Sequence, residues 1–294
     1  MGTGGEGVDL TGRTVVITGG NSGIGRETGV ALAGMGAHVV LTARDQRKGE
    51  AAAVEARRRS GNDRVETAEL DLASFASIRR FAGDLLDRHD RLDVLVNNAG
   101  LVLDRRTRTE DGFETTFGVN HLGPFLLTAL VRDRLEASQP ARIVNVSSTA
   151  HTLARNGLDF DDLQSERRYS GSKAYGRSKL ANVLFTRELA RRLVGTGVTA
   201  NALHPGIIRS GFAVDGDVRG VRAVVVRLVR PFLSSAEHGA RTSVYVASSP
   251  ELDGVTGLYF DRQRVAPISA AAADDAAALR LWEVSEELVG ASGS

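Results

Sequence analysis

The sequence predicts an α/β fold, in which helices cover both faces of one doubly wound parallel sheet. Short apolar runs alternate with helical patterns through the first half of the chain, which is typical of βαβ units. The runs VVITG, VVLTA and VLVNN are apolar on consecutive residues, as expected for strands buried on both faces. The alternation continues toward the C-terminus, so we expect about seven strands in a single-domain sheet.

We expect strands over residues 14–18, 38–42, 65–70, 92–96, 142–146, 198–203 and 257–260. Helical patterns cover residues 24–35, 46–60, 74–89, 109–136, 172–194 and 274–288. A break in the fourth helix is expected near Gly123 and Pro124, because proline removes a backbone donor. We find no internal repeat and no linker, which predicts one domain over residues 11–290 after a flexible arm over residues 1–10.

Composition argues against several classes of function. The 294 residues carry a net charge of +1, so bulk electrostatics predict neither a nucleic-acid partner nor a charged membrane surface. The chain holds no cysteine, which excludes disulfides, thiolate catalysis and cysteine-based zinc sites. The N-terminus lacks the pattern of a signal peptide, and no stretch has the length of a membrane span. We therefore expect a cytoplasmic protein with no integral membrane segment.

The segment TGGNSGIG, residues 18–25, predicts a phosphate-binding turn between the first strand and the first helix. Glycine accepts positive φ and has no Cβ, so backbone N–H groups can approach a pyrophosphate at the helix N-terminus. The residues of this expected cradle are Gly19, Asn21, Ser22, Gly23, Ile24 and Gly25. The alternative is an ordinary glycine-rich turn that binds no phosphate. The motifs further along the chain argue against this interpretation.

The end of the second strand decides which dinucleotide the turn would bind. NAD-binding proteins place an acidic residue there, whereas this chain has Ala43 followed by Arg44. A guanidinium offers the charge and the bidentate geometry that a ribose 2′-phosphate needs, and Arg26 supplies a second cation. We therefore predict NADP(H). The alternatives are that Asp45 is the acid of an NAD site, or that it merely caps the next helix.

Tyr175 and Lys179 lie four residues apart in YGRSK, on one face of the expected helix over 172–194. A tyrosine near a lysine cation is suited to proton transfer, because the positive charge favours the phenolate and lowers the tyrosine pKa. Tyr169 and Lys173 have the same spacing. A long amphipathic pattern follows Lys179 but not Lys173, which favours Tyr175 and Lys179 as the functional pair.

Four motifs occur in one order along the chain: the glycine-rich turn, NNAG at 97–100, VNVSS at 144–148 and YGRSK at 175–179. Together they resemble the short-chain dehydrogenase/reductase family, over nearly the whole chain from about residue 10. The resemblance implies a Rossmann-like fold and hydride transfer between a nicotinamide and an alcohol/carbonyl pair. It also implies roles for single residues.

By this resemblance, Tyr175 is the general acid/base, and Lys179 tunes it and binds the nicotinamide ribose. Ser148 would hold the substrate oxygen, and Asn120 would bind a water that relays protons from Lys179. The resemblance also implies cofactor contacts along the ends of the strands, from Asp71, Leu72, Asn98, Ala99, Gly100, Pro205, Gly206 and Ile208. For Asp71 the alternative is an N-cap of the helix that starts near Ser74.

The 27 residues from Ser148 to Tyr175 leave room for an extended loop over residues 149–171. This loop and the motif SKLANVLFTRELARRL resemble the subgroup of retinol dehydrogenases and related carbonyl reductases. The vertebrate retinol enzymes carry a membrane-anchoring segment that this sequence lacks, which weakens a transfer of the retinoid substrate.

The segment 207–233 interrupts the α/β rhythm and carries the apolar run VRAVVVRLVRPFL. We interpret it as a lid over an apolar substrate, with a helix packed on the domain or a membrane contact as alternatives. We expect no metal, because His121, His151 and His204 share no ligand spacing. The absence of G-x-S-x-G argues against a serine hydrolase.

The sequence thus predicts an NADP(H)-dependent enzyme that reduces a small apolar aldehyde or ketone. Reduction of an activated C=C bond and a cofactor sensor without turnover are the alternatives. A homodimer through the long helices that carry Asn120 and Tyr175 is compatible with the family, although the extended loop before Tyr175 would hinder it.

Overall fold

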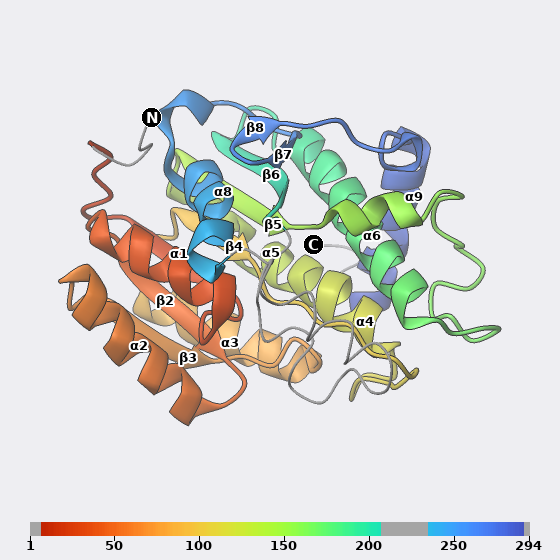
Figure 1. Cartoon of the computed structure of the whole chain (residues 1–294), viewed down its shortest axis with the longest axis horizontal. Helices are drawn as coiled ribbons and strands as arrows, with labels where there is room; N and C mark the ends of the chain where they lie inside the picture. The colour runs from red at the N-terminus through yellow and green to blue at the C-terminus, as the bar shows by residue number, and fades with distance from the viewer. Residues whose placement is uncertain (1–6, 207–234, 291–294) are drawn as a thin grey trace.

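The computed structural model describes residues 7–206 and 235–290. Its centre is an eight-stranded sheet with the order β3-β2-β1-β4-β5-β6-β7-β8 (Figure 1). The first seven strands are parallel, and β8 pairs antiparallel with β7. The strands are β1 (Thr14–Ile17), β2 (His38–Ala43), β3 (Val65–Glu69), β4 (Val94–Asn97), β5 (Ala141–Val146), β6 (Val198–His204), β7 (Tyr259–Asp261) and β8 (Arg264–Val265).

Helices cover both faces of this sheet, as the doubly wound interpretation requires. One face is covered by α1 (Gly23–Gly34), α2 (Gln46–Ser60) and α8 (Ala236–Ser248), which share one apolar cluster with the sheet. The other face is covered by α3 (Phe75–Arg88), α5 (Gly123–Ala137) and α6 (Gly171–Arg192), and α9 (Asp275–Val289) belongs to the same second cluster. The predicted fold class is therefore confirmed, with one short edge strand more than the sequence suggested.

The expected helix over 109–136 is wrong over its first residues. Residues 109–112 form a turn that closes a bridge between Arg108 and Glu114. The Glu114 carboxylate then accepts from the backbone N–H groups of Thr116 and Phe117, both at 2.8 Å, and so starts α4 (Thr115–Phe117). A capping carboxylate satisfies the donors at a helix start, which is why the helix begins here and not at residue 109.

A π-helical segment, η1 (Gly118–Leu122), joins α4 to α5. The expected break at Gly123 and Pro124 is where α5 starts, with the proline in its first turn. π-Helical turns such as η1 are rare, and they occur frequently at functional sites. This one carries Asn120, which is fully buried.

We made no prediction for α8 or for β8 from the sequence. The buried face of α8 combines the small residues Gly239, Ala240 and Ser243 with Val244 and Ala247. The strand β8 has only two residues, both exposed, and arises from the turn at Arg262 and Gln263.

In the described part of the chain, no helix combines the length and apolar character needed to cross a membrane. The last residue of the expected N-terminal arm, Leu10, donates its backbone N–H to Met35 at 2.8 Å. The expected lid over 207–233 lies outside the described residues.

Candidate active site

The glycine-rich turn between β1 and α1 has the geometry of an anion cradle. Gly19 and Gly23 have φ values of +65° and +54°, which only glycine adopts readily. A Cβ on Gly25 would lie 2.5 Å from the Gly19 carbonyl oxygen, so no larger residue fits there. Ser22, the residue before α1, makes no side-chain cap, and the first turn of α1 holds no acidic residue. The helix N-terminus therefore offers backbone N–H groups to an anion.

Thr18 and Asn98 fix this turn against the end of β4. The Thr18 hydroxyl accepts from the backbone N–H groups of Asn98 and Ala99, at 2.9 and 3.0 Å. The Asn98 side chain donates to the Thr18 carbonyl at 2.8 Å. Asn98 thus positions the glycine turn as well as lining it. Thr18 was not singled out from the sequence, although its place as the first residue of TGGNSGIG was visible.

A basic rim lies beside the turn. Arg44 is exposed after β2, and Lys48 on α2 lines a hollow of about 300 Å³ together with Asn21, Ser22 and Arg26. The Arg26 guanidinium also pairs with Glu27 at 3.1 Å. Lys48 was not recognised from the sequence, because only the fold of α2 brings it back to the glycine turn.

Asp45 caps α2 by accepting from the backbone N–H of Lys48 at 3.2 Å. This agrees with the capping interpretation of Asp45 and gives its carboxylate a structural task. Asp71, in contrast, is not the cap of α3. Its carboxylate accepts from Ala73 at 2.9 Å, and Ser74 caps α3. Leu72 beside it is buried and packs against Gly123.

Tyr175 and Lys179 lie near the carboxyl end of β5, on consecutive turns of α6. The Lys179 nitrogen lies 5.6 Å from the centre of the Tyr175 ring, and Ser148 lies close enough to the Tyr175 hydroxyl to lower its pKa. Ser148 follows β5, and its hydroxyl also accepts from Ala150 at 3.1 Å. The structure therefore brings together the three residues expected at the reacting centre.

The expected lowering of the Tyr175 pKa by Lys179 is wrong. Burial raises the pKa of Tyr175 to about 12, against a smaller lowering by the Ser148 hydrogen bond. Burial also lowers the pKa of Lys179 to about 8. The Lys179 ammonium group is turned toward the Val146 carbonyl oxygen, which it reaches at 2.9 Å. Desolvation therefore outweighs the attraction between the two groups.

Asn120 closes the other side of this centre. Its side-chain oxygen accepts from Leu101 at 2.8 Å, and its side-chain nitrogen donates to the Leu101 carbonyl at 2.9 Å and to Ser178 at 3.0 Å. A Cβ on Gly100 would lie 3.3 Å from the Asn120 oxygen and 3.4 Å from the Lys179 nitrogen. Gly100 therefore allows the Asn120 and Lys179 side chains to approach one another.

The second Tyr–Lys pair has a different environment. The Tyr169 hydroxyl donates to the Leu103 carbonyl at 3.0 Å and lies 3.4 Å from a Glu114 carboxylate oxygen. Lys173 is exposed. Tyr169 thus fastens the extended loop to the segment after β4, and the geometry favours Tyr175 and Lys179.

His151 has a defined protonation state and supports Ser148. Its Nδ1 lies 2.8 Å from the Ser148 carbonyl oxygen, and its Nε2 lies 3.3 Å from the backbone N–H of Ser269. A carbonyl only accepts and an amide N–H only donates, so the proton is on Nδ1. Burial lowers the pKa of His151, which keeps the ring neutral. The sequence had excluded His151 as a metal ligand but had not recognised this positioning role.

The remaining expected cofactor residues lie partly in the described chain. Pro205 and Gly206 directly follow β6, and Gly206 has a φ of +90°. Ile208 lies outside the described residues. His121 is fully buried in the second apolar cluster, where burial lowers its pKa to about 3, and its Nε2 lies 2.8 Å from the Ser285 hydroxyl.

Comparisons with known proteins agree with this geometry. The family model described as short chain dehydrogenase matches residues 13–160. Retinol dehydrogenase 12 from Homo sapiens is 48% identical over 283 residues, which cover 96% of this chain and 88% of that protein. Retinol dehydrogenase 14 from Homo sapiens is 45% identical, with 96% of this chain and 87% of that protein covered.

Two solved structures extend the comparison to the fold. An uncharacterised protein from Mycobacterium paratuberculosis is 38% identical, with a TM-score of 0.77 over 98% of this chain and 97% of that chain. The NADP complex of RhlG from Pseudomonas aeruginosa is 27% identical, with a TM-score of 0.66 over 86% of this chain and 95% of that chain. This chain therefore belongs to the short-chain dehydrogenase/reductase family, and it is an oxidoreductase of the alcohol/carbonyl class.

Proposed function

We propose that this chain is an NADP(H)-dependent reductase of apolar aldehydes or ketones, with Tyr175 as its proton donor. The observation that carries the proposal is the convergence of Tyr175, Lys179 and Ser148. The Lys179 nitrogen, one helical turn further along α6, lies 5.6 Å from the Tyr175 ring centre, and Ser148 is close enough to the Tyr175 hydroxyl to act on its pKa. Two hydroxyls that face each other beside a buried lysine suit the binding and protonation of one carbonyl oxygen.

The glycine cradle fits a dinucleotide. The positive φ of Gly19 and Gly23 and the lack of space for a Cβ at Gly25 are what close backbone approach to a pyrophosphate requires. When bound, the nicotinamide supplies or accepts the hydride. The residues that would hold the rest of the cofactor are Asp71, Leu72, Asn98, Ala99, Gly100, Lys179, Pro205, Gly206 and Ile208.

The preference for NADP(H) is supported by the basic rim. Arg44 and Lys48 provide two exposed cations beside the turn, and the capping task of Asp45 turns the nearest carboxylate to the backbone of α2. A 2′-phosphate would be bound by these cations, whereas an NAD ribose would gain little from them. The solved RhlG complex contains NADP, which is consistent with such a site in this fold.

The Tyr175 pKa is compatible with a role as proton donor in carbonyl reduction. With a pKa of about 12, this hydroxyl is protonated at neutral pH and can protonate an alkoxide as it forms. Lys179, with a pKa of about 8, is mostly charged at neutral pH and would resupply the proton through a water bound at Asn120. A proton donor of this kind suits carbonyl reduction, which is the direction that NADPH as the hydride donor favours.

The apolar nature of the substrate is supported by two observations. The similar proteins include retinol dehydrogenases, whose names give an apolar alcohol. The run VRAVVVRLVRPFL within residues 207–233 is largely apolar in sequence, as the interpretation of a lid over an apolar substrate requires.

Product analysis tests this function against its alternatives. The chain is incubated with NADPH or NADH and a panel of apolar aldehydes, ketones and enones, and the products are identified. An alcohol, formed faster with NADPH, supports the proposal. A saturated ketone from the enone would instead identify a C=C reductase. Tight NADPH binding with no product from any compound would favour the sensor.

The homodimer through the helices that carry Asn120 and Tyr175 stays a prediction, to which the packing of the C-terminal helix adds one requirement. Trp282 of α9 packs on Phe125 of α5 and Phe185 of α6, with ring centres 4.9 and 5.9 Å apart. A homodimer that uses this face would therefore include α9 in its interface. The cytoplasmic location stays a prediction, which cell fractionation would test.

A further inference from the structure

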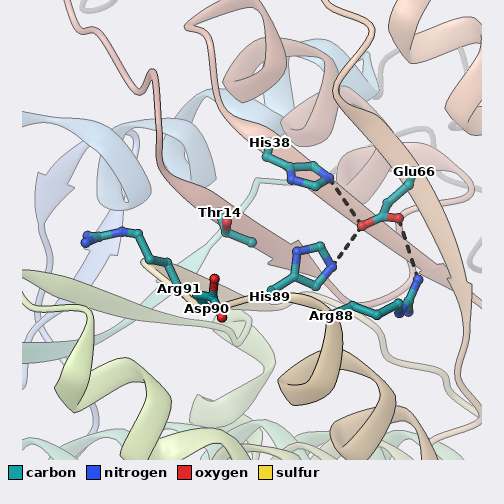
Figure 2. A pocket seen from close by; sticks show the side chains of 7 residues that line it. All are labelled: Thr14, His38, Glu66, Arg88, His89, Asp90 and Arg91. Carbon is teal, nitrogen blue, oxygen red and sulfur yellow. Dashed lines mark ion pairs between the residues drawn. The ribbon is translucent and has the colours of Figure 1, made fainter.

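Two histidines and a glutamate meet at the amino ends of the strands, on the side of the sheet opposite the expected cofactor site (Figure 2). His38 is the first residue of β2, Glu66 is the second residue of β3, and His89 directly follows α3. The cofactor residues follow the carboxyl ends of the strands, whereas this cluster lies at their amino ends. It is therefore separate from the reacting centre by the full length of the strands.

The three side chains converge on one point. The Glu66 Oε1 atom lies 3.2 Å from His38 Nε2 and 2.9 Å from His89 Nε2. All three ligand atoms lie within 4.8 Å of one another, and Figure 2 shows both rings directed at the same carboxylate oxygen. Tetrahedral zinc with bonds of about 2.0–2.1 Å places its ligand atoms about 3.3 Å apart. The two histidine–carboxylate separations, 3.2 and 2.9 Å, are close to this spacing.

Neighbouring groups define the surroundings of the cluster. The Arg88 guanidinium lies 3.6 Å from Oε2 of Glu66, an ion pair with the carboxylate oxygen that does not face the histidines. Glu66 Oε1 and His89 Nε2 are both shielded from solvent. A hollow of about 540 Å³, lined in part by Thr14, Asp90 and Arg91, borders the cluster and has room for a water as fourth ligand.

We propose that His38, Glu66 and His89 bind one Zn²⁺ ion, or a divalent ion of similar preference. Two imidazoles and one carboxylate are a set that zinc accepts, whereas magnesium and calcium prefer oxygen ligands only. The ion would join β2, β3 and the end of α3, and so stabilise this edge of the sheet. Its distance from Tyr175 predicts a structural effect with no change in turnover.

The sequence did not predict this site, because its three ligands come from three separate elements. The spacing between His38, Glu66 and His89 follows no short motif, and only the parallel pairing of β2 with β3 brings two of them together. The other interpretation is an ion network without a metal, in which Glu66 is paired with the two histidines and with Arg88. The experiment below separates the two.

The test uses the full chain without a histidine tag, stripped with a chelator and titrated calorimetrically with Zn²⁺. We expect one ion per chain, and a rise in Tm on addition of Zn²⁺. Loss of a residue that only hydrogen-bonds to a metal ligand weakens metal binding by about 10- to 100-fold. His38→Gln, Glu66→Gln and His89→Gln each remove a direct ligand, so each should weaken Zn²⁺ binding by at least that factor. His238→Gln, which changes an exposed histidine of α8, should bind as wild type does.

A second measurement needs no variant. Bound Zn²⁺ should protect the partly exposed His38, but not His238, from modification by diethyl pyrocarbonate, as read by peptide mass spectrometry. Lack of saturable Zn²⁺ binding to the wild type would overturn the proposal in favour of the ion network. Binding that is equal in the His38→Gln, His89→Gln and His238→Gln variants, or Zn²⁺ binding that leaves His38 unprotected, would overturn it as well.

Discussion

The ammonium nitrogen of Lys179 donates a hydrogen bond to the carbonyl oxygen of Val146, at a distance of 2.9 Å. The Ser147 hydroxyl in turn donates to the Lys179 carbonyl at 2.8 Å, so the end of β5 and the middle of α6 are joined twice. This holds the lysine in the interior, where burial lowers its pKa from 10.5 to about 8. Lys179, which the proposed chemistry needs, therefore lowers the stability of the folded state.

We predict that Lys179→Met stabilises the protein. At pH 7 the buried Lys179 is charged, and the lowered pKa means that this charge destabilises the folded state by about 3 kcal/mol. Loss of the hydrogen bond to Val146 offsets about 1 kcal/mol of this. The free energy of unfolding, measured with urea, should therefore rise by about 1–2 kcal/mol, while turnover is lost.

The stability difference between the wild type and Lys179→Met should depend on pH. Between pH of about 8 and 10.5 the unfolded chain binds more protons at Lys179 than the folded chain, so wild-type stability rises with pH relative to the variant. The advantage of Lys179→Met should shrink over this window. Lys173→Met, at an exposed site of the same helix, should change stability by less than about 0.5 kcal/mol. A Lys179→Met protein less stable than wild type at pH 7 would contradict this account.

Gly25→Ala should abolish cofactor binding. The added Cβ would lie 2.5 Å from the Gly19 carbonyl oxygen and 2.6 Å from the Asn98 side chain, so the cradle must open. The matched control is Gly34→Ala in the same helix, where a Cβ meets no atom within 4 Å. That variant should bind NADPH as wild type does and gain up to about 1 kcal/mol of stability. Equal NADPH affinity in the two variants, measured by fluorescence titration, would argue against the cradle.

The double variant Arg44→Ala/Lys48→Ala should lose its preference for NADPH. Hydrogen bonds to charged groups contribute about 1.5–3 kcal/mol, so kcat/KM with NADPH should fall by about 10- to 100-fold. The value with NADH should change little, because NAD lacks the 2′-phosphate. Arg47→Ala, an exposed neighbour on α2, serves as control. A parallel fall with both cofactors would mean that these cations do not read the 2′-phosphate.

Trp282→Ala should destabilise the chain by about 3–5 kcal/mol, as expected for a large buried aromatic. The Trp282 ring packs on Phe125 and Phe185, and the Arg192 guanidinium lies 4.3 Å above it. The Trp282 indole nitrogen has no hydrogen-bond partner among the described residues, so Trp282→Phe should cost much less. Urea unfolding measures both values, and an equal loss in the two variants would show that α9 is not held by ring packing.

Much of the fold was predictable, because it depends on local patterns. Consecutive apolar residues identified β1, β2 and β4, and the helix over 46–60 was placed correctly because Asp45 caps its start and Gly61 ends it at a φ of +69°. The start of α4 was missed because the Glu114 cap depends on how the segment before it turns. The helix α8 was missed because it directly follows the segment 207–233, which interrupts the α/β pattern of the sequence.

The candidate site was predictable where it follows a motif. The glycine turn, Ser148, Tyr175 and Lys179 lie in short segments, and the structure brings them together at the ends of the strands. Lys48 and the Thr18 link to Asn98 depend on how separate elements meet, which no single segment encodes. The Tyr175 pKa was predicted in the wrong direction, because burial is a property of the fold and not of the Tyr–Lys spacing.

The role of Tyr175 is the central claim, and the most direct measurement is NADPH consumption with an apolar aldehyde by the wild type, Tyr175→Phe and Tyr169→Phe. Loss of a general acid predicts a fall in kcat of about 10²- to 10⁴-fold for Tyr175→Phe, with NADPH affinity unchanged. Tyr169→Phe, which removes only a loop contact, should retain turnover. Full activity in Tyr175→Phe, or a loss confined to Tyr169→Phe, would contradict the account.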